Sequence, residues 1–207
     1  MKYKYYIWDF GGTLFNTYPG VALSFQIALK NKNIDEKIEN IIEYVKVSKN
    51  FAAQYFQNKY GIEDGFEELV EKIEDEIPNS DRKPFAGSDK ILQYIKDNGG
   101  MNFIYTHRSS DSAFGLLDYY NYTKFFKDIV AKEDKLKRKP DPEGFLYFIS
   151  KFELKKEETL TIGDRAIDII SGVNAGIDTV YFNPDGEINK DAKWSVKNYE
   201  ELFKIIK

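Results

Sequence analysis

Short apolar segments alternate with helical patterns over most of the chain after residue 84, and this alternation restricts the fold more than any other feature. Residues 101–105, 128–131, 159–162 and 178–182 form short apolar segments, which are typical of β-strands. Between these segments, apolar residues recur at helical spacing. Strands that alternate with helices predict an α/β fold, a doubly wound parallel sheet with helices on both faces.

A different pattern occupies residues 16–84, where helical stripes follow one another and no strand pattern separates them. The stripes are Val21, Phe25, Ala28 and Leu29; Ile34, Ile38, Ile41, Ile42 and Val45; Phe51, Tyr55 and Phe56; and Phe66, Leu69, Val70, Ile73 and Ile77. Such stripes predict an α-helical bundle inserted after the first strand. The predicted domains are an α/β core of residues 1–15 and 85–207 and the inserted bundle of residues 16–84.

The chain opens with an apolar run, residues 5–8, that leads to a carboxylate and a tight turn. Asp9 follows the run directly, and Gly11-Gly12-Thr13 then turn the chain. Thr106 and Asp164 stand at the ends of two later predicted strands. The active groups of parallel sheets lie at the carboxyl ends of the strands. The sequence therefore predicts that these polar residues meet at one edge of the sheet.

Carboxylates dominate this predicted edge. Asp168 lies four residues beyond Asp164, on the same face of the predicted helix, and both would join Asp9. Three crowded carboxylates repel one another unless a cation joins them, and oxygen ligands favour Mg²⁺, which often bridges to a phosphate. Lys139 and the Thr106 hydroxyl would then hold the phosphate oxygens.

The turn after Asp9 adds further expected contacts. The backbone N–H groups of Gly11 and Gly12 are expected to help hold a phosphate. The Asp9 carboxylate, its charge balanced by the metal, can attack phosphorus and form an aspartyl-phosphate. The sequence thus predicts a phosphoryl-transfer site that contains Mg²⁺.

In this order and at this spacing, the motifs resemble the haloacid dehalogenase (HAD) superfamily, and more narrowly its phosphoglycolate-phosphatase-like branch. The resemblance rests on Asp9-Phe10-Gly11-Gly12-Thr13-Leu14, Thr106, Lys139-Pro140-Asp141-Pro142 and Gly163-Asp164-Arg165-Ala166-Ile167-Asp168. It covers essentially the whole chain, and although each motif is weak alone, the ordered set is specific. The resemblance implies a Rossmann-like core, a cap domain formed by the inserted bundle, and hydrolysis of small phosphorylated metabolites.

The resemblance also implies a role for each matching residue. Asp9 matches the nucleophile, Thr106 the hydroxyl of the second motif and Lys139 the lysine of the third, and these are the implied catalytic residues. The implied metal ligands are Asp9, the Gly11 carbonyl, Asp164 and Asp168. The implied phosphate contacts are Gly11, Gly12, Thr106, His107 and Lys139.

Gly11 departs from the family pattern. Phosphatases of the family have a second Asp here, which protonates the leaving group and then activates the hydrolytic water. Glycine keeps the backbone carbonyl, so the implied metal site survives. The lost acid–base catalysis is worth roughly 10²–10⁴-fold in rate. His107, the only histidine, is a candidate substitute, although a bystander role is favoured.

Several alternatives stay open at this point. The chain could be a catalytically silent relative that binds a phosphorylated ligand or a protein partner. It could also resemble phosphonatases, which cleave carbon–phosphorus bonds with a cap lysine, and Lys46 and Lys49 are the lysines considered. Dehalogenases also lack the second Asp but do not use magnesium, so the pair Asp164 and Asp168 argues against that reaction. Arg108 and Arg165 are expected to face solvent rather than substrate.

Composition narrows the partners and the compartment. The formal net charge is −4, with basic residues spread along the chain, which does not indicate nucleic-acid binding. The chain has no cysteine, which excludes disulfides and thiolate metal sites and fits a reducing cytoplasm. No stretch approaches the ~20 apolar residues of a membrane helix, and the N-terminus lacks the features of a signal peptide. We therefore expect a cytoplasmic monomer or homodimer whose partner is a small phosphorylated metabolite.

Overall fold

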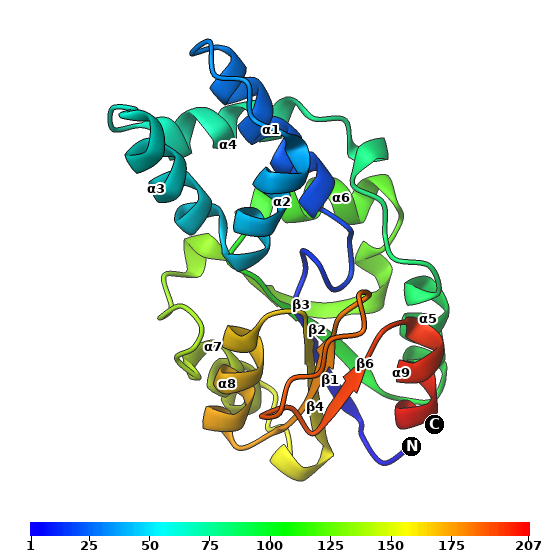
Figure 1. The fold of residues 1–207 in the computed structure, drawn as a ribbon. Helices are drawn as coiled ribbons and strands as arrows, with labels where there is room; N and C mark the ends of the chain where they lie inside the picture. The colour runs from blue at the N-terminus through cyan, green and yellow to red at the C-terminus, as the bar shows by residue number, and fades with distance from the viewer. The chain divides into compact units, whose positions relative to one another are not determined.

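The computed structural model describes all 207 residues and divides into two compact units (Figure 1). The core unit comprises Met1–Phe15 and Pro84–Lys207, and the helical unit comprises Asn16–Lys83. The first fifteen residues belong to the core unit because the first strand pairs with strands from the second half of the chain.

The core unit is built on a six-stranded sheet in which every pairing is parallel. Its strands are β1 (Tyr5–Trp8), β2 (Met101–Tyr105), β3 (Phe126–Val130), β4 (Thr159–Gly163), β5 (Asp178–Phe182) and β6 (Trp194–Val196). Their spatial order is β3-β2-β1-β4-β5-β6. The predicted α/β fold with a parallel, Rossmann-like sheet is confirmed. The sequence pattern did not reveal β6, because three residues are too few to produce a readable strand pattern.

Helices cover both faces of this sheet (Figure 1). The helices of the core unit are α5 (Ser88–Asp97), α6 (Ser110–Tyr119), α7 (Glu143–Lys151), α8 (Ala166–Ala175) and α9 (Tyr199–Ile206). Three-residue 3₁₀ helices lie at Thr123–Phe125, Lys132–Asp134 and Lys156–Glu158. Alternate residues of β1 point to opposite faces, as the period of a strand requires. Tyr6 and Trp8 pack with α5, α6 and α9, whereas Ile7 packs with α7 and α8.

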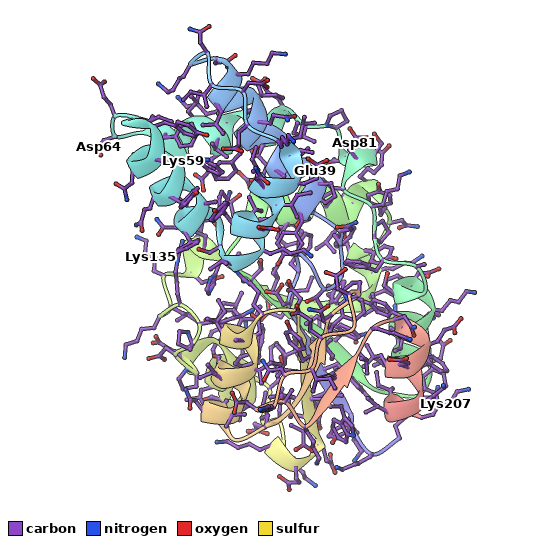
Figure 2. All side chains as sticks on the ribbon, viewed as in Figure 1. Glu39, Lys59, Asp64, Asp81, Lys135 and Lys207 are labelled. Carbon is purple, nitrogen blue, oxygen red and sulfur yellow. The ribbon has the colours of Figure 1, made fainter.

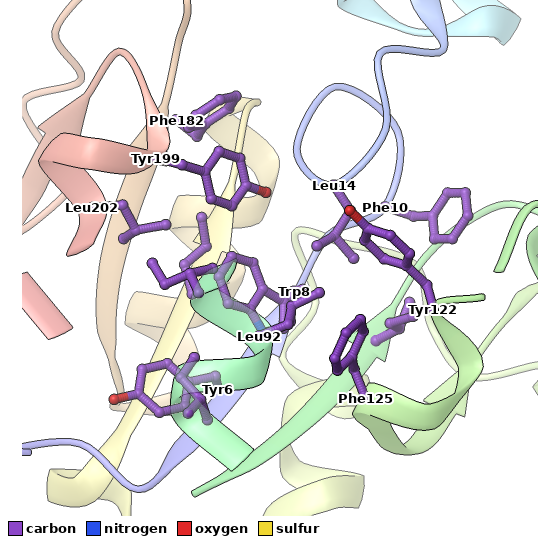
Figure 3. Packing of buried hydrophobic residues seen from close by; sticks show 14 of the residues in the cluster. Tyr6, Trp8, Phe10, Leu14, Leu92, Tyr122, Phe125, Phe182, Tyr199 and Leu202 are labelled. Atoms are coloured by element: carbon purple, nitrogen blue, oxygen red, sulfur yellow. The ribbon is translucent and has the colours of Figure 1, made fainter. Parts of the chain in front are cut away.

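Aromatic packing anchors β1 and the loop that follows it. The rings of Trp8 and Tyr199 stack with centroids 6.2 Å apart, and Figure 3 shows them side by side. Trp8 Nε1 donates to Asn102 Oδ1 at 2.9 Å, so the buried indole N–H is satisfied. The Tyr199 hydroxyl donates to the Thr13 carbonyl oxygen at 2.8 Å. These contacts hold the end of β1 and the following turn in place, and Asp9 lies between them.

The helical unit contains α1 (Tyr18–Lys30), α2 (Ile38–Val47), α3 (Lys49–Tyr60), α4 (Phe66–Glu76) and a 3₁₀ turn at Asn79–Asp81. The apolar stripes of these helices form one buried cluster centred on Phe25, Phe56 and Phe66. Gly61 follows the last residue of α3 as its C-cap and adopts a left-handed φ of 63°. Ile34 fits the periodicity of the α2 stripe but precedes the helix, although its side chain still packs against the cluster.

A buried carboxylate ties the helices of this unit together. Glu36 accepts hydrogen bonds from Lys59 Nζ at 2.6 Å, from the Tyr60 hydroxyl and from Asn40 Nδ2 at 2.8 Å. These bonds, led by the one from Lys59, lower the pKa of Glu36 to about 2. Lys59, labelled in Figure 2, lies near the end of α3, so Glu36 joins α3 to the start of α2.

The sequence predicts Ser88 and Asp141 as helix N-caps, and in the structure each of these two helix starts is shifted by one residue. Ser88 is the first residue of α5 rather than its N-cap, and its hydroxyl donates to the Phe85 carbonyl oxygen at 2.7 Å. Pro142 is the N-cap of α7, while Asp141 Oδ1 accepts from the Glu143 N–H at 3.0 Å and still satisfies the first turn. None of the helices has the length and apolar composition to cross a membrane.

Candidate active site

The site lies where the strand order reverses. β1 pairs with β2 on one side and with β4 on the other, so connections leave this point in both directions. Asp9 follows β1 directly, is 3% exposed, and donates its backbone N–H to the Ile162 carbonyl oxygen at 2.8 Å. Asp164 follows β4 directly. In open α/β sheets, ligands bind in the crevice at this switch point.

The turn after Asp9 is closed by its own backbone. Gly12 adopts a left-handed φ of 88°, and its N–H donates to the Phe15 carbonyl oxygen at 2.8 Å. That bond occupies the Gly12 N–H group in this structure, and its expected contact with a phosphate stays a prediction. Gly11 is not among the residues at positive φ, and the roles of its N–H and carbonyl stay predictions.

Lys139 is the centre of the site. Its Nζ is buried and donates to Asp9 Oδ1 at 2.8 Å, to Asp168 Oδ1 at 2.7 Å and to the Tyr105 carbonyl oxygen at 2.8 Å. The ammonium also lies over the Tyr105 ring, 4.6 Å from its centroid. The lysine that was expected to hold a phosphate is therefore bonded to the predicted nucleophile and to a predicted metal ligand in this structure.

Burial and ion pairing compete in setting the charges of this cluster. Burial raises the pKa of the Asp9 carboxyl, and Lys139 only partly opposes that shift. Burial acts in the same direction on Asp168, but Lys139 and Arg165 together hold the pKa of Asp168 below its usual value. Burial alone would lower the pKa of Lys139, yet the carboxylates of Asp168 and Asp9 raise it. Lys139 is thus a permanent cation in this site.

The segment after β4 brings the Asp168 side chain unusually close to the backbone of Gly163. A Cβ at position 163 would lie 2.3 Å from Asp168 Cβ, so only glycine allows this approach. Asp168 Oδ2 accepts from the Arg165 backbone N–H at 3.0 Å. α8 begins at Ala166, so Asp164 precedes the helix, and the predicted shared helix face is wrong. Loop geometry rather than helical spacing brings the two carboxylates together.

Arg165 belongs to the site, contrary to the expectation that it faces solvent. Its Nη2 lies 4.0 Å from Asp9 Oδ1 and its Nε lies 3.8 Å from Asp168 Oδ2, and its side chain is 20% exposed. Arg108 instead donates from Nη1 to Ser112 Oγ at 2.9 Å.

The carboxylates fit a metal ion. One oxygen from each of Asp9, Asp164 and Asp168 lies within 4.8 Å of the others. Asp164 is only partly buried and accepts a hydrogen bond at its Oδ1 from Thr13 Oγ1 at 3.1 Å. An all-oxygen donor set at this spacing suits a hard divalent cation such as Mg²⁺.

His107 is a structural partner of Lys139. Its Nε2 accepts the backbone N–H of Lys139 at 3.0 Å, so the proton of the neutral ring is on Nδ1. Burial, together with Lys139, Arg165 and Arg138, lowers the pKa of His107 to about 3. The imidazole is therefore neutral at physiological pH and lacks an acidic proton for catalysis. Thr106 Oγ1 lies at the same edge of the sheet and accepts the Arg108 N–H at 3.1 Å.

Sequence reasoning missed Tyr105 and Gly144, which shape the seat of Lys139. The Tyr105 hydroxyl donates to the Lys137 carbonyl oxygen at 2.9 Å, which ties the loop that carries Lys139 to β2. A Cβ at position 144 would lie 2.4 Å from the Tyr105 ring. A glycine in the first turn of a predicted helix was the available signal, because glycine is unfavourable there unless close packing requires it.

In the helical unit, the lysines considered for phosphonatase chemistry lack the setting of a Schiff-base lysine. Lys49 Nζ pairs with Glu74 Oε2 at 2.9 Å and with Glu71 Oε1 at 3.4 Å. Lys46 is exposed. An activated lysine is usually desolvated or beside another cation, so the structure does not favour this alternative.

The fold and site define a hydrolase family. Residues 6–182 match the haloacid dehalogenase-like hydrolase family, and the chain belongs to it. The chain is 26% identical over 192 residues to the pyrophosphatase PpaX of Bacillus mycoides, covering 87% of this chain and 83% of that protein. It is 24% identical over 175 residues to the phosphoglycolate phosphatase of Aquifex aeolicus, covering 84% and 81%.

A solved structure shares the fold. The chain superposes with a TM-score of 0.81 on YfnB from Bacillus subtilis bound to magnesium, over 100% of this chain and 99% of that one, with 22% identity. At this identity the match shows the fold alone.

Proposed function

We propose that this enzyme is a magnesium-dependent phosphatase of small phosphorylated metabolites, with Asp9 as its nucleophile. The observation that carries the proposal is the buried cluster of Asp9, Lys139 and Asp168 at the switch point of the sheet. A carboxylate, a permanent cation and a candidate metal site in contact suit phosphoryl transfer, in which positioning and electrostatic stabilisation provide most of the catalysis.

Each residue then has a defined task. Lys139 bonds Oδ1 of Asp9, which orients the carboxylate so that Oδ2 can attack phosphorus. The Thr106 hydroxyl and the Gly11 N–H hold oxygens of the transferring group. Asp9, Asp164, Asp168 and the Gly11 carbonyl would hold Mg²⁺, which when bound would supply positive charge that balances the carboxylates and the phosphoryl group.

Gly11 limits the rate of this reaction. No side chain at position 11 can give a proton to the leaving group or take one from water. The missing step corresponds to about 10²–10⁴-fold in rate, so the enzyme is expected to be slow with ordinary phosphate esters. The same residue favours the second candidate, a relative that binds phosphorylated ligands without turnover.

The relatives support a phosphatase, since they are named for hydrolysis of pyrophosphate and of phosphoglycolate. The magnesium in a protein of the same fold supports the choice of metal. We further propose that the helical unit acts as the cap domain and carries the contacts that select the substrate.

Turnover of phosphorylated compounds by wild type and Asp9→Asn, with Mg²⁺ and with EDTA, tests the proposal. We expect phosphate release that requires both Asp9 and Mg²⁺, and an acid-trapped phosphoryl group on Asp9 detected by mass spectrometry. Equal turnover by wild type and Asp9→Asn would refute the proposal. Ligand binding without phosphate release from any substrate would favour the silent relative.

A further inference from the structure

We propose that this site selects phosphoryl donors whose leaving group departs as a stable anion, namely phosphoanhydrides and acyl phosphates. Arg165 supplies positive charge to the transferring phosphoryl group, and no core side chain supplies a proton. This inference rests on the proposed phosphatase function and specifies the substrate class of the same site.

The side chains around Asp9 determine whether a departing oxygen can receive a proton. Gly11 has no side chain to donate one. The His107 ring is fixed as an acceptor of the Lys139 N–H through Nε2. The Tyr105 hydroxyl is directed to the Lys137 carbonyl oxygen at 2.9 Å. Lys139 Nζ already donates to Asp9 Oδ1, Asp168 Oδ1 and the Tyr105 carbonyl oxygen. The core side chains around Asp9 therefore offer no acid for a departing oxygen.

The side chains around Asp9 also place positive charge beside a transferring phosphoryl group. The Arg165 guanidinium lies 4.0 Å from Asp9 Oδ1, so a phosphoryl group in transfer to Asp9 would lie beside it. A guanidinium does not release its proton in proteins, but it stabilises the charge spread over the oxygens of a transferring phosphoryl group. Lys139 provides a second fixed cation on the same carboxylate. The site is thus built to stabilise negative charge without moving a proton.

The reaction balances without a side-chain acid. An Asp9 oxygen forms a bond to phosphorus while the bond from phosphorus to the leaving oxygen breaks, and the electron pair leaves on that oxygen. A carboxylate or a phosphate accepts this pair as a stable anion, whereas an alkoxide is a strong base and needs a proton. Water then attacks phosphorus, the bond to Asp9 breaks and restores the carboxylate, and the proton of water passes to the phosphate product or to solvent.

Changes at Gly11 and at Arg165 should affect the rate in ways that depend differently on the leaving group. A missing acid matters most for poor leaving groups, so Gly11→Asp should help alkyl phosphates far more than acyl phosphates. Arg165 acts on the phosphoryl group common to all donors, so its loss should slow every donor by a similar factor. Gly11 lies outside the positive-φ residues, so an aspartate suits its backbone.

The test measures kcat/KM with Mg²⁺ for acetyl phosphate, pyrophosphate, 4-nitrophenyl phosphate, phenyl phosphate and glycerol phosphate. The kcat/KM of wild type should fall steeply as the leaving group becomes more basic. Gly11→Asp should gain about 10²–10⁴-fold with glycerol phosphate and less than about tenfold with acetyl phosphate. Arg165→Gln should lose about ten- to hundredfold with every donor, and Arg165→Lys, which keeps the charge, should lose less.

The outcomes separate this inference from the function on which it rests. The inference would be overturned if kcat/KM of wild type depended only weakly on leaving-group basicity, with Asp9-dependent turnover of glycerol phosphate close to that of acetyl phosphate. That result would leave the phosphatase proposal intact. An unchanged rate in Arg165→Gln would remove the assigned role of Arg165. No Asp9-dependent turnover of any donor would overturn both proposals. If Gly11→Asp does not fold, the steepness measured for wild type across the same donors still decides the inference.

Discussion

The backbone N–H of Lys139 donates to Nε2 of His107 across a distance of 3.0 Å. This bond joins the loop before α7 to the segment after β2, and it places the lysine whose Nζ reaches Asp9 and Asp168. His107 directly follows Thr106, and a histidine in this position is a candidate for acid–base catalysis. The geometry gives it a positioning role instead.

His107→Gln should keep most of the activity, because the Gln carboxamide oxygen can reach the position of Nε2. His107→Asn is shorter and should lose the bond to Lys139, which lowers kcat/KM by about tenfold, the value of one hydrogen bond. Rates measured from pH 5 to pH 8 provide the check. An ionisation near pH 6.5 that is present in wild type and absent from His107→Gln would contradict the positioning role.

Asp164→Asn and Asp168→Asn should separate metal binding from stability. Both changes should weaken Mg²⁺ binding, measured by titration calorimetry. Asp168→Asn should also lower the free energy of unfolding in EDTA by about 2–4 kcal/mol, because it removes a charge paired with the buried Lys139. Asp164→Asn should cost less than about 1 kcal/mol, because Asp164 is partly exposed. The exposed Asp111→Asn is the matched control and should change neither quantity.

Gly144→Ala should destabilise the seat of Lys139. The added Cβ would meet the Tyr105 ring at 2.4 Å, which should cost about 1–3 kcal/mol and reduce activity as the ring is displaced. Gly115→Ala, in α6, meets no neighbour within 4 Å and should be neutral or stabilising by up to about 1 kcal/mol. Denaturant unfolding and kcat/KM of the two variants make the comparison. Equal stability of both variants would contradict the close packing of Tyr105.

Glu36→Gln should destabilise the helical unit at neutral pH by about 1–2 kcal/mol. The change removes the negative charge of the carboxylate that accepts hydrogen bonds from Lys59 and Tyr60. The folded pKa of Glu36 is about 2, below its usual 4.5. Its contribution is therefore complete above about pH 4.5 and declines as the pH falls towards 2. Thermal unfolding of wild type and Glu36→Gln should converge over that interval. Glu39→Gln, at an exposed position, is the control, and a gap that widens as the pH falls would refute the prediction.

The parallel sheet was predictable because its signals are local. Each of the strands β2, β4 and β5 is a short, mostly apolar segment that a polar residue follows, and its predicted bounds agree with the structure within one residue. The three-residue β6 was not predictable. Its formation depends on β5, which supplies its hydrogen-bond partners, and not on a pattern within Trp194–Val196.

The candidate site was predictable as a set of residues but not as a set of bonds. Parallel strands present their carboxyl ends at one edge, so the order of residues along the chain was enough to assign Asp9, Thr106 and Asp164 to that edge. The bond from Lys139 to His107 and the position of Arg165 beside Asp9 depend on how separate loops fold over that edge.

The sequence by itself determined the α/β class, the inserted helical segment and the absence of an acid at position 11, because strand periodicity, helix periodicity and residue identity are all written locally along the chain. Only the tertiary structure decided the partners of the charged groups. It placed Lys139 between Asp9 and Asp168, made His107 a neutral acceptor and moved Arg165 into the site. The physical reason is that the energy of a buried charge depends on the distances and desolvation set by segments far apart in the sequence.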